Sequence, residues 1–306
     1  MKNASESSSV KLYKSDYIMQ GISHVVLGIM TLLALLPFVL LIIASFTDEE
    51  TAIRNGFSFF PEKWGLNAYR YLAGEWSQIG HAYIMTILVT VIGTTLCLIL
   101  TTLLAYGLTR DIVGKTFLNF FVVFTMLFNG GIVASYFVWT RYFHIKNTIW
   151  ALILPGLLIS AFNIILIKNY FQTSVPESLL ESARIDGAGE FTIFGKIVLP
   201  LSKPIIATIG LMSALGYWNN WTNGLYYIDD HSLYTIQLVL NQINESASYL
   251  ASNSSQMGSM INGTASIPTT TMRMAIAVIA ILPILVIYPF FQKYFVKGIT
   301  IGAVKG

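Results

Sequence analysis

The sequence predicts an all-α integral membrane protein with six membrane-spanning helices. Of its 306 residues, 55% are hydrophobic and only 11% are charged, whereas soluble globular domains carry about 25% charged residues. The mean hydropathy is +0.65. Apolar runs recur along the chain that are long enough to cross a bilayer core, which needs about 20 helical residues. These three observations exclude an ordinary soluble enzyme or binding domain.

The apolar runs divide the chain into a short tail, residues 1–20, and one transmembrane domain, residues 21–306. The first run, residues 25–46, is longer than the apolar core of a signal peptide and has no small-residue cleavage site after it, so we expect it to be retained. The six expected spans cover residues 22–46, 82–109, 117–139, 149–169, 201–224 and 272–294. Proline residues inside these runs, which predict kinks, are Pro37, Pro155, Pro283 and Pro289.

The orientation follows from the positive charges, because cytoplasmic loops carry an excess of Lys and Arg. With both termini inside, six of the 18 Lys and Arg residues lie outside and the rest lie in the cytoplasmic segments. The six outer residues are Arg54, Lys63, Arg70, Arg141, Lys146 and Arg273. This distribution predicts both termini in the cytoplasm. Arg141 and Lys146 are a local exception, since we expect them outside without an acidic partner.

Two of the connections expected on the extracytoplasmic side of the membrane are informative. The first, residues 47–80, is rich in aromatic and turn residues, so we expect it to be ordered. The second, residues 226–271, is long and rich in Ser and Asn. The spacing of Ile236, Leu240 and Ile243 predicts one amphipathic helix within it.

A polar interlude, residues 170–200, separates the fourth and fifth expected spans. Residues 176–188 predict a short amphipathic helix that is stopped by Gly187 and Gly189. Its expected apolar strip is formed by Leu179, Leu180, Ala183 and Ala188. Glu181, Arg184 and Asp186 lie elsewhere on its circumference, which is typical of a helix that docks against a partner outside the bilayer.

At these residues the sequence resembles a known family. Glu181, Ser182 and Ala183, then Gly187, then Ile197, Leu199 and Pro200 are spaced like the EAA loop of the permease subunits of ABC importers. The family usually has Ala where this chain has Ser182. The resemblance implies a coupling helix that sits in a cleft of an ATP-hydrolysing subunit. The residues it assigns to coupling are Glu181, Ser182, Ala183, Asp186, Gly187, Ala188, Ile197, Leu199 and Pro200.

Over residues 20–306 the chain is similar to the maltose-type carbohydrate importers, and within these to the smaller permease of oligosaccharide systems. That resemblance implies a heterodimer with a second permease, two ATPase subunits and an extracytoplasmic sugar-binding protein, in the lipid of a bacterial cytoplasmic membrane. It also implies that this chain is no enzyme and has no cofactor, because ATP and magnesium belong to the ATPase subunits. Glu181 would orient the helix in its cleft, Gly187 would allow the turn, and Leu199 and Pro200 would redirect the chain into the fifth span.

Polar residues inside the spans are candidates for the substrate pathway. Asn129, Gly130 and Gly131 lie near the centre of the third span, where two glycines permit close helix approach or a break. The fifth span ends in aromatic and amide side chains, which together suit a sugar. The candidates there are Tyr217, Trp218, Asn219, Asn220, Trp221 and Asn223. An aromatic belt at the membrane surface is the alternative interpretation of this stretch.

Other function classes are disfavoured by what the sequence lacks. No Asp, Glu, Lys or Arg lies well inside an expected span, which weighs against a proton- or sodium-coupled carrier. The four His residues have no metal-ligand spacing, and no basic tract suits nucleic acid. The single cysteine, Cys97, lies in an apolar run and is expected to be buried. A permease for a non-sugar solute and an ATP-independent carrier remain as alternatives.

Overall fold

The structure is a computed structural model that describes residues 14–257 and 269–303. All regular elements in these ranges are helices, and the one extended pairing is an isolated bridge between Thr47 and Trp64. The expected all-α class is therefore confirmed for the part of the chain that is described. The chain divides into two compact units, which are Met1–Arg70 with Ala265–Val278 and Tyr71–Thr264 with Ile279–Gly306.

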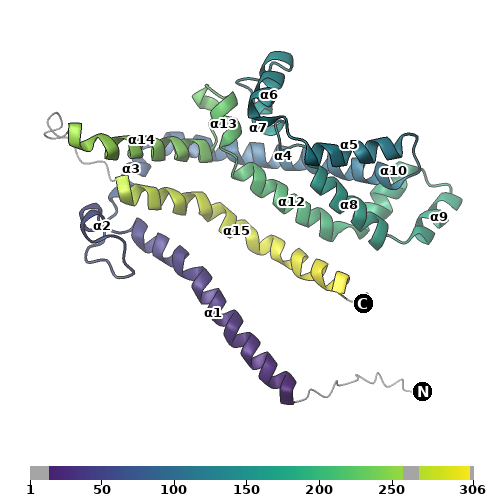
Figure 1. Cartoon of the computed structure of the whole chain (residues 1–306), viewed down its shortest axis with the longest axis horizontal. Helices are drawn as coiled ribbons and strands as arrows, with labels where there is room; N and C mark the ends of the chain where they lie inside the picture. Colours follow the sequence, from purple (N-terminus) through teal and green to yellow (C-terminus); the bar gives the residue numbers. More distant parts are fainter. Residues whose placement is uncertain (1–13, 258–268, 304–306) are drawn as a thin grey trace. The chain divides into compact units, whose positions relative to one another are not determined.

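The first unit contains α1 (Lys14–Ser45), α2 (Glu49–Asn55), the start of α3 (Asn67–Gly74) and the start of α15 (Thr269–Ala303) (Figure 1). The connection after α1 is packed, as its aromatic residues predict: the Phe46 and Tyr69 rings stack with centroids 4.8 Å apart, and Tyr69 Oη lies 2.8 Å from Ser45 Oγ. α1 begins at Lys14, so residues 14–20 of the expected tail are helical. Residues 1–13 of that tail lie outside the described ranges.

Within the second unit, α4 (Trp76–Thr109) is the central helix and packs against α8 (Ala161–Ser174) and α12 (Lys203–Trp218). The contact with α12 is close, because a Cβ atom added to Gly93 would lie 2.6 Å from the Tyr217 ring. Cys97 is fully buried at the same interface, as expected, with its Sγ 3.4 Å from Ser213 Oγ. Tyr83 on α4 and Trp218 on α12 donate hydrogen bonds to the backbone of α15 at residues 279 and 280.

α14 (Ile236–Met257) confirms the helix expected in the long polar connection. Ile236 and Leu240 are buried, and the backbone N–H of Ile236 donates to Thr86 Oγ1 on α4 at 2.8 Å. The apolar positions at helical spacing thus attach this connection to the central helix. Residues 258–268 of the same connection lie outside the described ranges.

Three helical segments of the described chain are long and apolar enough to cross a membrane: Tyr17–Ser45, Trp76–Thr109 and Thr270–Pro289. Two bent pairs bring the number to five if each pair is one span. They are Lys115–Leu127 with Gly131–Tyr142, bent by 118°, and Glu190–Leu201 with Lys203–Trp218, bent by 81°. By length and composition, the described residues therefore supply three to five spans rather than six uninterrupted ones.

The expected third and fourth spans are interrupted helices. α5 (Lys115–Leu127) is followed by α6 (Gly131–Phe137) and the π-helix η1 (Val138–Tyr142), and the break coincides with Asn129, Gly130 and Gly131. α7 (Ile149–Ile153) ends before Pro155 and Gly156, and α8 starts only at Ala161. Proline lacks a backbone N–H and Gly156 has a φ of +71°, so a continuous helix over 149–169 is not possible there.

The polar interlude, the end of the fifth expected span and the start of the connection after it form a series of short helices. They are α9 (Glu177–Ile185), α10 (Glu190–Ile193), the π-helix η2 (Phe194–Val198), α11 (Leu199–Leu201), α13 (Thr222–Tyr227) and the 3-10 helix η3 (His231–Leu233). Figure 1 shows α8 and α10 near one end of α4 and α14 along its other end. The interlude is thus presented at one end of the central helix.

Candidate functional site

The interlude folds into a helix and a turn that its local sequence specifies. Pro176 precedes α9 with an extended backbone, and Glu177 lies in the first turn, where a carboxylate is favoured by the helix dipole. Gly187 has a φ of +81°, which is costly for any residue with a side chain. The turn is closed by a hydrogen bond from the N–H of Ala188 to the carbonyl of Ala183, 2.9 Å long. α9 ends at Ile185, three residues before the expected end.

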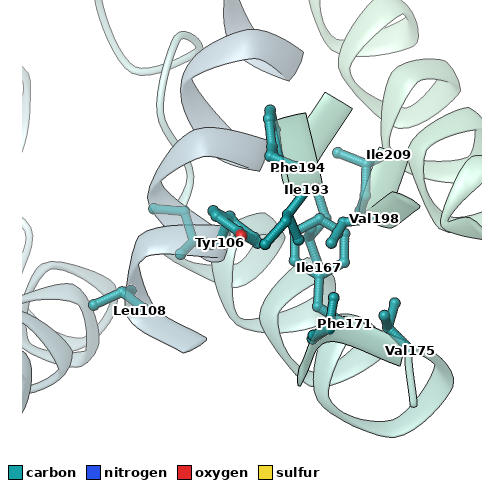
Figure 2. Close-up of a cluster of buried hydrophobic side chains, with 12 residues drawn as sticks. Tyr106, Leu108, Ile167, Phe171, Val175, Ile193, Phe194, Val198 and Ile209 are labelled. Carbon is teal, nitrogen blue, oxygen red and sulfur yellow. The ribbon is translucent and has the colours of Figure 1, made fainter. Parts of the chain in front are cut away.

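A buried apolar cluster, which we call the loop cluster, supports this turn (Figure 2). Its side chains come from α4, α8, α9, α10, η2 and α12. They are Ala105, Tyr106, Leu108, Ile164, Ile167, Phe171, Val175, Leu180, Ile193, Phe194, Val198 and Ile209. Since burying one Val, Leu, Ile or Phe side chain contributes about 1.5–3 kcal/mol, the cluster fixes the base of the loop to the helices below it.

The residues assigned to coupling divide into an inner and an outer set. Ala183, Ala188, Ile197 and Leu199 pack against the loop cluster. Glu181, Ser182, Asp186, Gly187 and Pro200 are exposed. The exposed set carries the charge and the turn, so it is the part of the loop that a partner could contact.

The apolar strip of α9 is narrower than expected. Leu180 is buried and Ala183 packs against the cluster, but Leu179 is 42% exposed. Leu179 therefore lies on the outer surface, one position around the helix from the buried stripe. Ile185 is 87% exposed and Phe191 is 86% exposed. The sequence interpretation did not single out these two apolar side chains, which add to the exposed surface beside Asp186.

Charged side chains connect the loop to the end of α4, an arrangement that the sequence interpretation missed. We call Tyr106, Arg110, Glu177, Arg184 and Glu190 the ionic tether. Arg184 Nε lies 3.2 Å from Glu190 Oε1, and Arg184 Nη1 lies 3.6 Å from Glu177 Oε1. Arg110 Nε lies 3.7 Å from Glu190 Oε2, and Arg110 Nη1 lies 3.9 Å from Glu177 Oε1. The Tyr106 hydroxyl donates a hydrogen bond to Glu190 Oε2.

Arg110 is the most enclosed charge of the tether. Its side chain is 13% exposed, and its guanidinium lies 4.4 Å from the centre of the Tyr106 ring, within the range of a cation–π interaction. Its Nε is buried and has no hydrogen-bond partner among the described residues. The guanidinium borders a cavity of about 630 Å³ that Phe191 and Phe194 also line. On the exposed side of the tether, the hydrogen bond to Glu190 raises the pKa of Arg184.

The aromatic and amide residues proposed for the substrate pathway have different surroundings. Tyr217, Trp218 and Asn223 are buried, and each donates a side-chain hydrogen bond to a backbone carbonyl, at residues 153, 280 and 155 respectively. Asn219 and Trp221 are exposed. Asn220 is half-buried, and its Oδ1 accepts from the N–H of Asn223 at 2.9 Å. The polar groups of the buried residues therefore stabilise the end of α12 and the start of α13.

The glycine-containing break between α5 and α6 is exposed in the single chain. Asn129 Oδ1 accepts a hydrogen bond from the N–H of Gly131 at 2.8 Å, and Gly131 has a φ of +76°. Asn129, Gly130 and Gly131 are all exposed. They and the pair Asn219 and Trp221 are the members of the proposed pathway that are accessible for a ligand or a second chain.

A second connection between distant segments, which we call the outer clip, joins residues 144–147 to residues 227–230. Lys146 Nζ lies 2.8 Å from Asp229 Oδ2, so the expectation that Lys146 has no acidic partner is wrong. Asn147, with a φ of +57°, accepts hydrogen bonds at Oδ1 from the N–H groups of Asp229 and Asp230. The hydrogen bond from Lys146 lowers the pKa of Asp229. The pair was missed because its members are far apart in sequence.

The described residues contain no group of three or more His, Cys, Asp and Glu side chains that could hold a metal ion. Two of the histidines make contacts within the protein. His81 Nε2 lies 2.8 Å from the carbonyl oxygen of Ser232, and the His231 and Tyr234 rings are 4.5 Å apart.

Comparisons with known proteins show the family of the chain. Residues 17–301 match the family "Binding-protein-dependent transport system inner membrane component". The polygalacturonan/rhamnogalacturonan transport system permease protein YtcP of Bacillus subtilis is 44% identical over 276 residues, which cover 90% of this chain and 94% of that protein. Protein LplC of the same organism is 40% identical over 281 residues, which cover 92% of each chain.

A solved structure is similar along almost its whole length. It is the crystal structure of a bacterial ABC transporter involved in the import of the acidic polysaccharide alginate. The superposition has a TM-score of 0.74 at 30% sequence identity and covers 93% of this chain and 99% of that one.

Proposed function

Because the chain belongs to the family of binding-protein-dependent transport system inner membrane components, we propose that it is a permease subunit of an ATP-driven sugar importer. Its substrate is a sugar, and the relatives named for polygalacturonan/rhamnogalacturonan transport and alginate import favour an oligosaccharide. The chain forms half of the translocation pathway and performs no chemistry itself. ATP and magnesium are bound by partner subunits.

The observation that supports this function most directly is the supported, outward-facing turn of residues 177–189. A partner protein can move α9 only if α9 has an exposed surface for binding and is connected rigidly to the membrane spans. Glu181, Ser182 and Asp186 offer the exposed surface, and the loop cluster supplies the connection. We assign the ATPase-coupling role to the exposed set together with Ile185, because its apolar side chain is 87% exposed beside that set.

The membrane topology consistent with this function has six spans. α1, α4 and α15 are three of them, and α5 with α6, α7 with α8, and α12 with α13 are interrupted spans. Irregular backbone at membrane depth is tolerated where it is buried in protein or lines a cavity. Both termini and α9 are then cytoplasmic, and α14 and the outer clip are on the other side of the bacterial cytoplasmic membrane.

The breaks in the interrupted spans are the candidate substrate path. Exposed amide and indole groups at Asn219 and Trp221 suit sugar hydroxyls and the apolar face of a sugar ring. The second permease forms the other half of the path, opposite Asn129 and its two glycines. The buried members, Tyr217, Trp218 and Asn223, hold these groups in place through their backbone hydrogen bonds.

Affinity purification of the chain from its native membrane in mild detergent, followed by mass spectrometry, tests the proposal. We expect a second multi-span permease and an ATPase in the purified complex, and an extracytoplasmic sugar-binding protein that stimulates its ATP hydrolysis. A chain that purifies alone and moves solute in liposomes without ATP would contradict the importer assignment. Stimulation only by a binding protein loaded with an amino acid or peptide would instead contradict the sugar assignment.

A further inference from the structure

The loop of residues 177–200, which we call the coupling loop, is joined to the two principal helices of its unit in different ways. α12 follows α10, η2 and α11 directly along the chain, so any displacement of the loop is passed to α12 through the backbone. α4 has no such connection, because α5 to α8 intervene between α4 and α9. α4 nevertheless packs along both α8 and α12 and must move with them if the unit is to move as one body.

We propose that Arg110 is a positioning residue for transport, which makes α4 follow α9 by holding the carboxylates of Glu177 and Glu190. The proposal rests on the proposed function, since it requires that a partner ATPase moves α9. It adds to that function a residue outside the 177–200 loop. Arg110 touches neither ATP nor sugar in this arrangement and acts through the two carboxylates.

The apolar contact of α9 alone is a weak constraint on its position. Leu180 is the one residue of α9 that is fully buried, and Ala183 contributes only a methyl group to the cluster. Contacts of this kind are non-directional, so they permit sliding and rotation. Charge-assisted hydrogen bonds are directional and fix a register, and ion pairs in a partly buried site add attraction between particular partners.

The ionic tether supplies that directional constraint between α4 on one side and α9 and α10 on the other. Glu190 accepts from Tyr106 on α4 and from Arg184 on α9, so one carboxylate joins the two helices. Arg110 lies between Glu190 at the start of α10 and Glu177 at the start of α9. Tyr106 covers one face of the guanidinium. With only 13% of its side chain exposed, Arg110 interacts with both carboxylates in a less polar medium than a surface pair does.

The distances place both carboxylates within ion-pair range of Arg110, which is 3.9 Å from Glu177 and 3.7 Å from Glu190. A displacement of α9 away from the end of α4 would lengthen the ion pair with Glu177 and weaken its Coulomb attraction. The attraction opposes that displacement, so Arg110 favours movement of the two helices together.

Distance measurements between two spin labels in the assembled, membrane-reconstituted transporter test the proposal. The buried Cys97 is replaced by Ala, and labels are attached to Ser178→Cys on α9 and Thr95→Cys on α4, both exposed positions. In the parent, we expect the distance between the labels to be the same with and without ATP trapped by vanadate. In Arg110→Gln, we expect trapping to shift the distance, because α9 moves and α4 lags. Arg110→Lys, which keeps the charge, should restore most of the parent behaviour.

Asp111→Asn is the matched control, because Asp111 neighbours Arg110 but forms its ion pair with Lys115, at 3.2 Å, and not with a residue of the ionic tether. It should behave as the parent does. If Arg110→Gln does not fold, Glu177→Gln removes one side of the tether at a carboxylate whose side chain is 66% exposed and should give a smaller shift.

The outcomes separate this proposal from the function on which it rests. An unchanged distance in Arg110→Gln, in a complex whose ATPase still displaces α9 relative to a label on the ATPase, would overturn the role of Arg110 alone. A preparation that contains no ATPase would overturn both. A shift in Asp111→Asn as large as that in Arg110→Gln would also overturn the role of Arg110, since it would reflect general loss of charge at the end of α4.

Discussion

Single residues set how closely the helices of the second unit approach. Gly93 on α4 faces the ring of Tyr217 on α12, and that ring also donates a hydrogen bond from its hydroxyl to the carbonyl of Ile153. The ring is held between three segments and has no free direction in which to move. A side chain at position 93 therefore has to displace a helix and not merely a rotamer.

We expect Gly93→Ala to destabilise the protein by about 1–3 kcal/mol, the usual cost of overpacking, because the added Cβ would meet ring carbons at 2.6 Å. Gly107→Ala on the same helix is the control, since its Cβ would have no atom within 4 Å. Thermal unfolding of the two variants in the same detergent measures the difference. Equal unfolding temperatures would contradict the close packing of α4 and α12.

A buried carboxylate in the first unit caps the start of α15. Glu49 is 8% exposed, and its carboxylate oxygens accept from the N–H groups of Thr270 and Thr271 at 2.8 and 2.9 Å. We expect Glu49→Ala to cost about 1–3 kcal/mol, because it leaves the buried N–H of Thr271 and the partly buried N–H of Thr270 without this acceptor. The neighbouring Glu50→Ala removes an exposed carboxylate and should have little effect. Chemical unfolding followed by fluorescence compares them, and a greater loss in Glu50→Ala would refute the capping role.

The stability of the outer clip depends on pH, and the direction of that dependence follows from the pKa of Asp229. Its pKa lies below the ordinary value because Lys146 donates a hydrogen bond to the carboxylate. A lowered carboxyl pKa means that the contribution to stability is complete above the ordinary Asp value of 3.8 and is lost as the pH falls through the lowered pKa. The effect is small, because the pair is exposed to solvent.

Hydrogen exchange of residues 144–148, expressed as protection factors, measures this effect. We expect protection to be constant from pH 7 to the ordinary Asp pKa and to fall below it. Lys146→Met should already show the reduced protection at pH 7 and should not lose more on acidification. A wild-type clip that loosens as the pH rises would have the opposite sign and would contradict the assignment.

At the scale of elements, the broken third span depends on the backbone of its glycines. Gly131 has a φ of +76°, and α5 and α6 meet at 118°. Gly130 has an ordinary φ of −71°, and its added Cβ would make only a normal contact of 3.8 Å. The bend is therefore assigned to one glycine of the pair.

We expect Gly131→Ala to cost about 1–2 kcal/mol, the penalty for a side chain in the left-handed region, and Gly130→Ala to be neutral or slightly stabilising. Thermal unfolding of the two variants provides the comparison. A larger loss in Gly130→Ala would show that close approach of another chain, rather than backbone conformation, requires the glycines.

The sequence predicted the elements whose signals are local. The apolar runs that became α1, α4 and α15, the spacing of Ile236 and Leu240 in α14, and the stop at Gly187 all depend on neighbouring residues. The interruptions after Ile153 and Trp218 were not predicted as breaks, because hydropathy averages over the short polar turns between apolar helices. Pro155 predicted a kink, and the left-handed Gly156 beside it made the kink a break.

The candidate site was predicted in the same uneven way. Its exposed residues, such as Glu181 and Asp186, follow from one contiguous motif. The ionic tether could not be predicted, because Arg110 meets Glu177 and Glu190 only after α5 to α8 have folded between them. For the same reason Tyr217, Trp218 and Asn223 resembled ligand groups in the sequence, while their polar atoms bind backbone carbonyls in the fold. A single sequence carries no signal for such long-range pairs.

At the scale of the whole molecule, the chain presents surfaces that a second body must cover. None of the residues of α5 is buried in the described structure, and phenylalanines along it stack on one another instead of on other helices. Glu181, Ser182, Asp186 and Gly187, in α9 and the turn after it, are likewise exposed. Large exposed apolar surfaces mark contacts with lipid or with partner proteins. The chain is therefore suited to work within an assembly in a membrane.

Coupling between that assembly and the spans should be lost when the turn after α9 is altered and the rest of the fold is kept. Proline at position 187 cannot adopt the φ of +81° and loses the hydrogen bond from the N–H of residue 187 to the carbonyl of Arg184. Lysine at position 181 reverses a charge on the exposed face. We expect Gly187→Pro and Glu181→Lys to insert into the membrane at normal levels and to lose at least about fivefold of the uptake obtained per ATP hydrolysed, the lower end of typical coupling effects.

Gly189→Ala and Glu62→Lys are the matched controls for these two changes. Gly189 has a φ of −72° and open space around its Cβ position, so alanine is tolerated there. Glu62 is exposed in the connection after α1, which the proposed topology puts on the opposite side of the membrane from α9. Uptake and ATP hydrolysis are measured together in proteoliposomes that contain the purified complex. Full uptake per ATP in Gly187→Pro would show that α9 is not the moving contact, because no rigid turn would then be needed to pass its displacement to the spans.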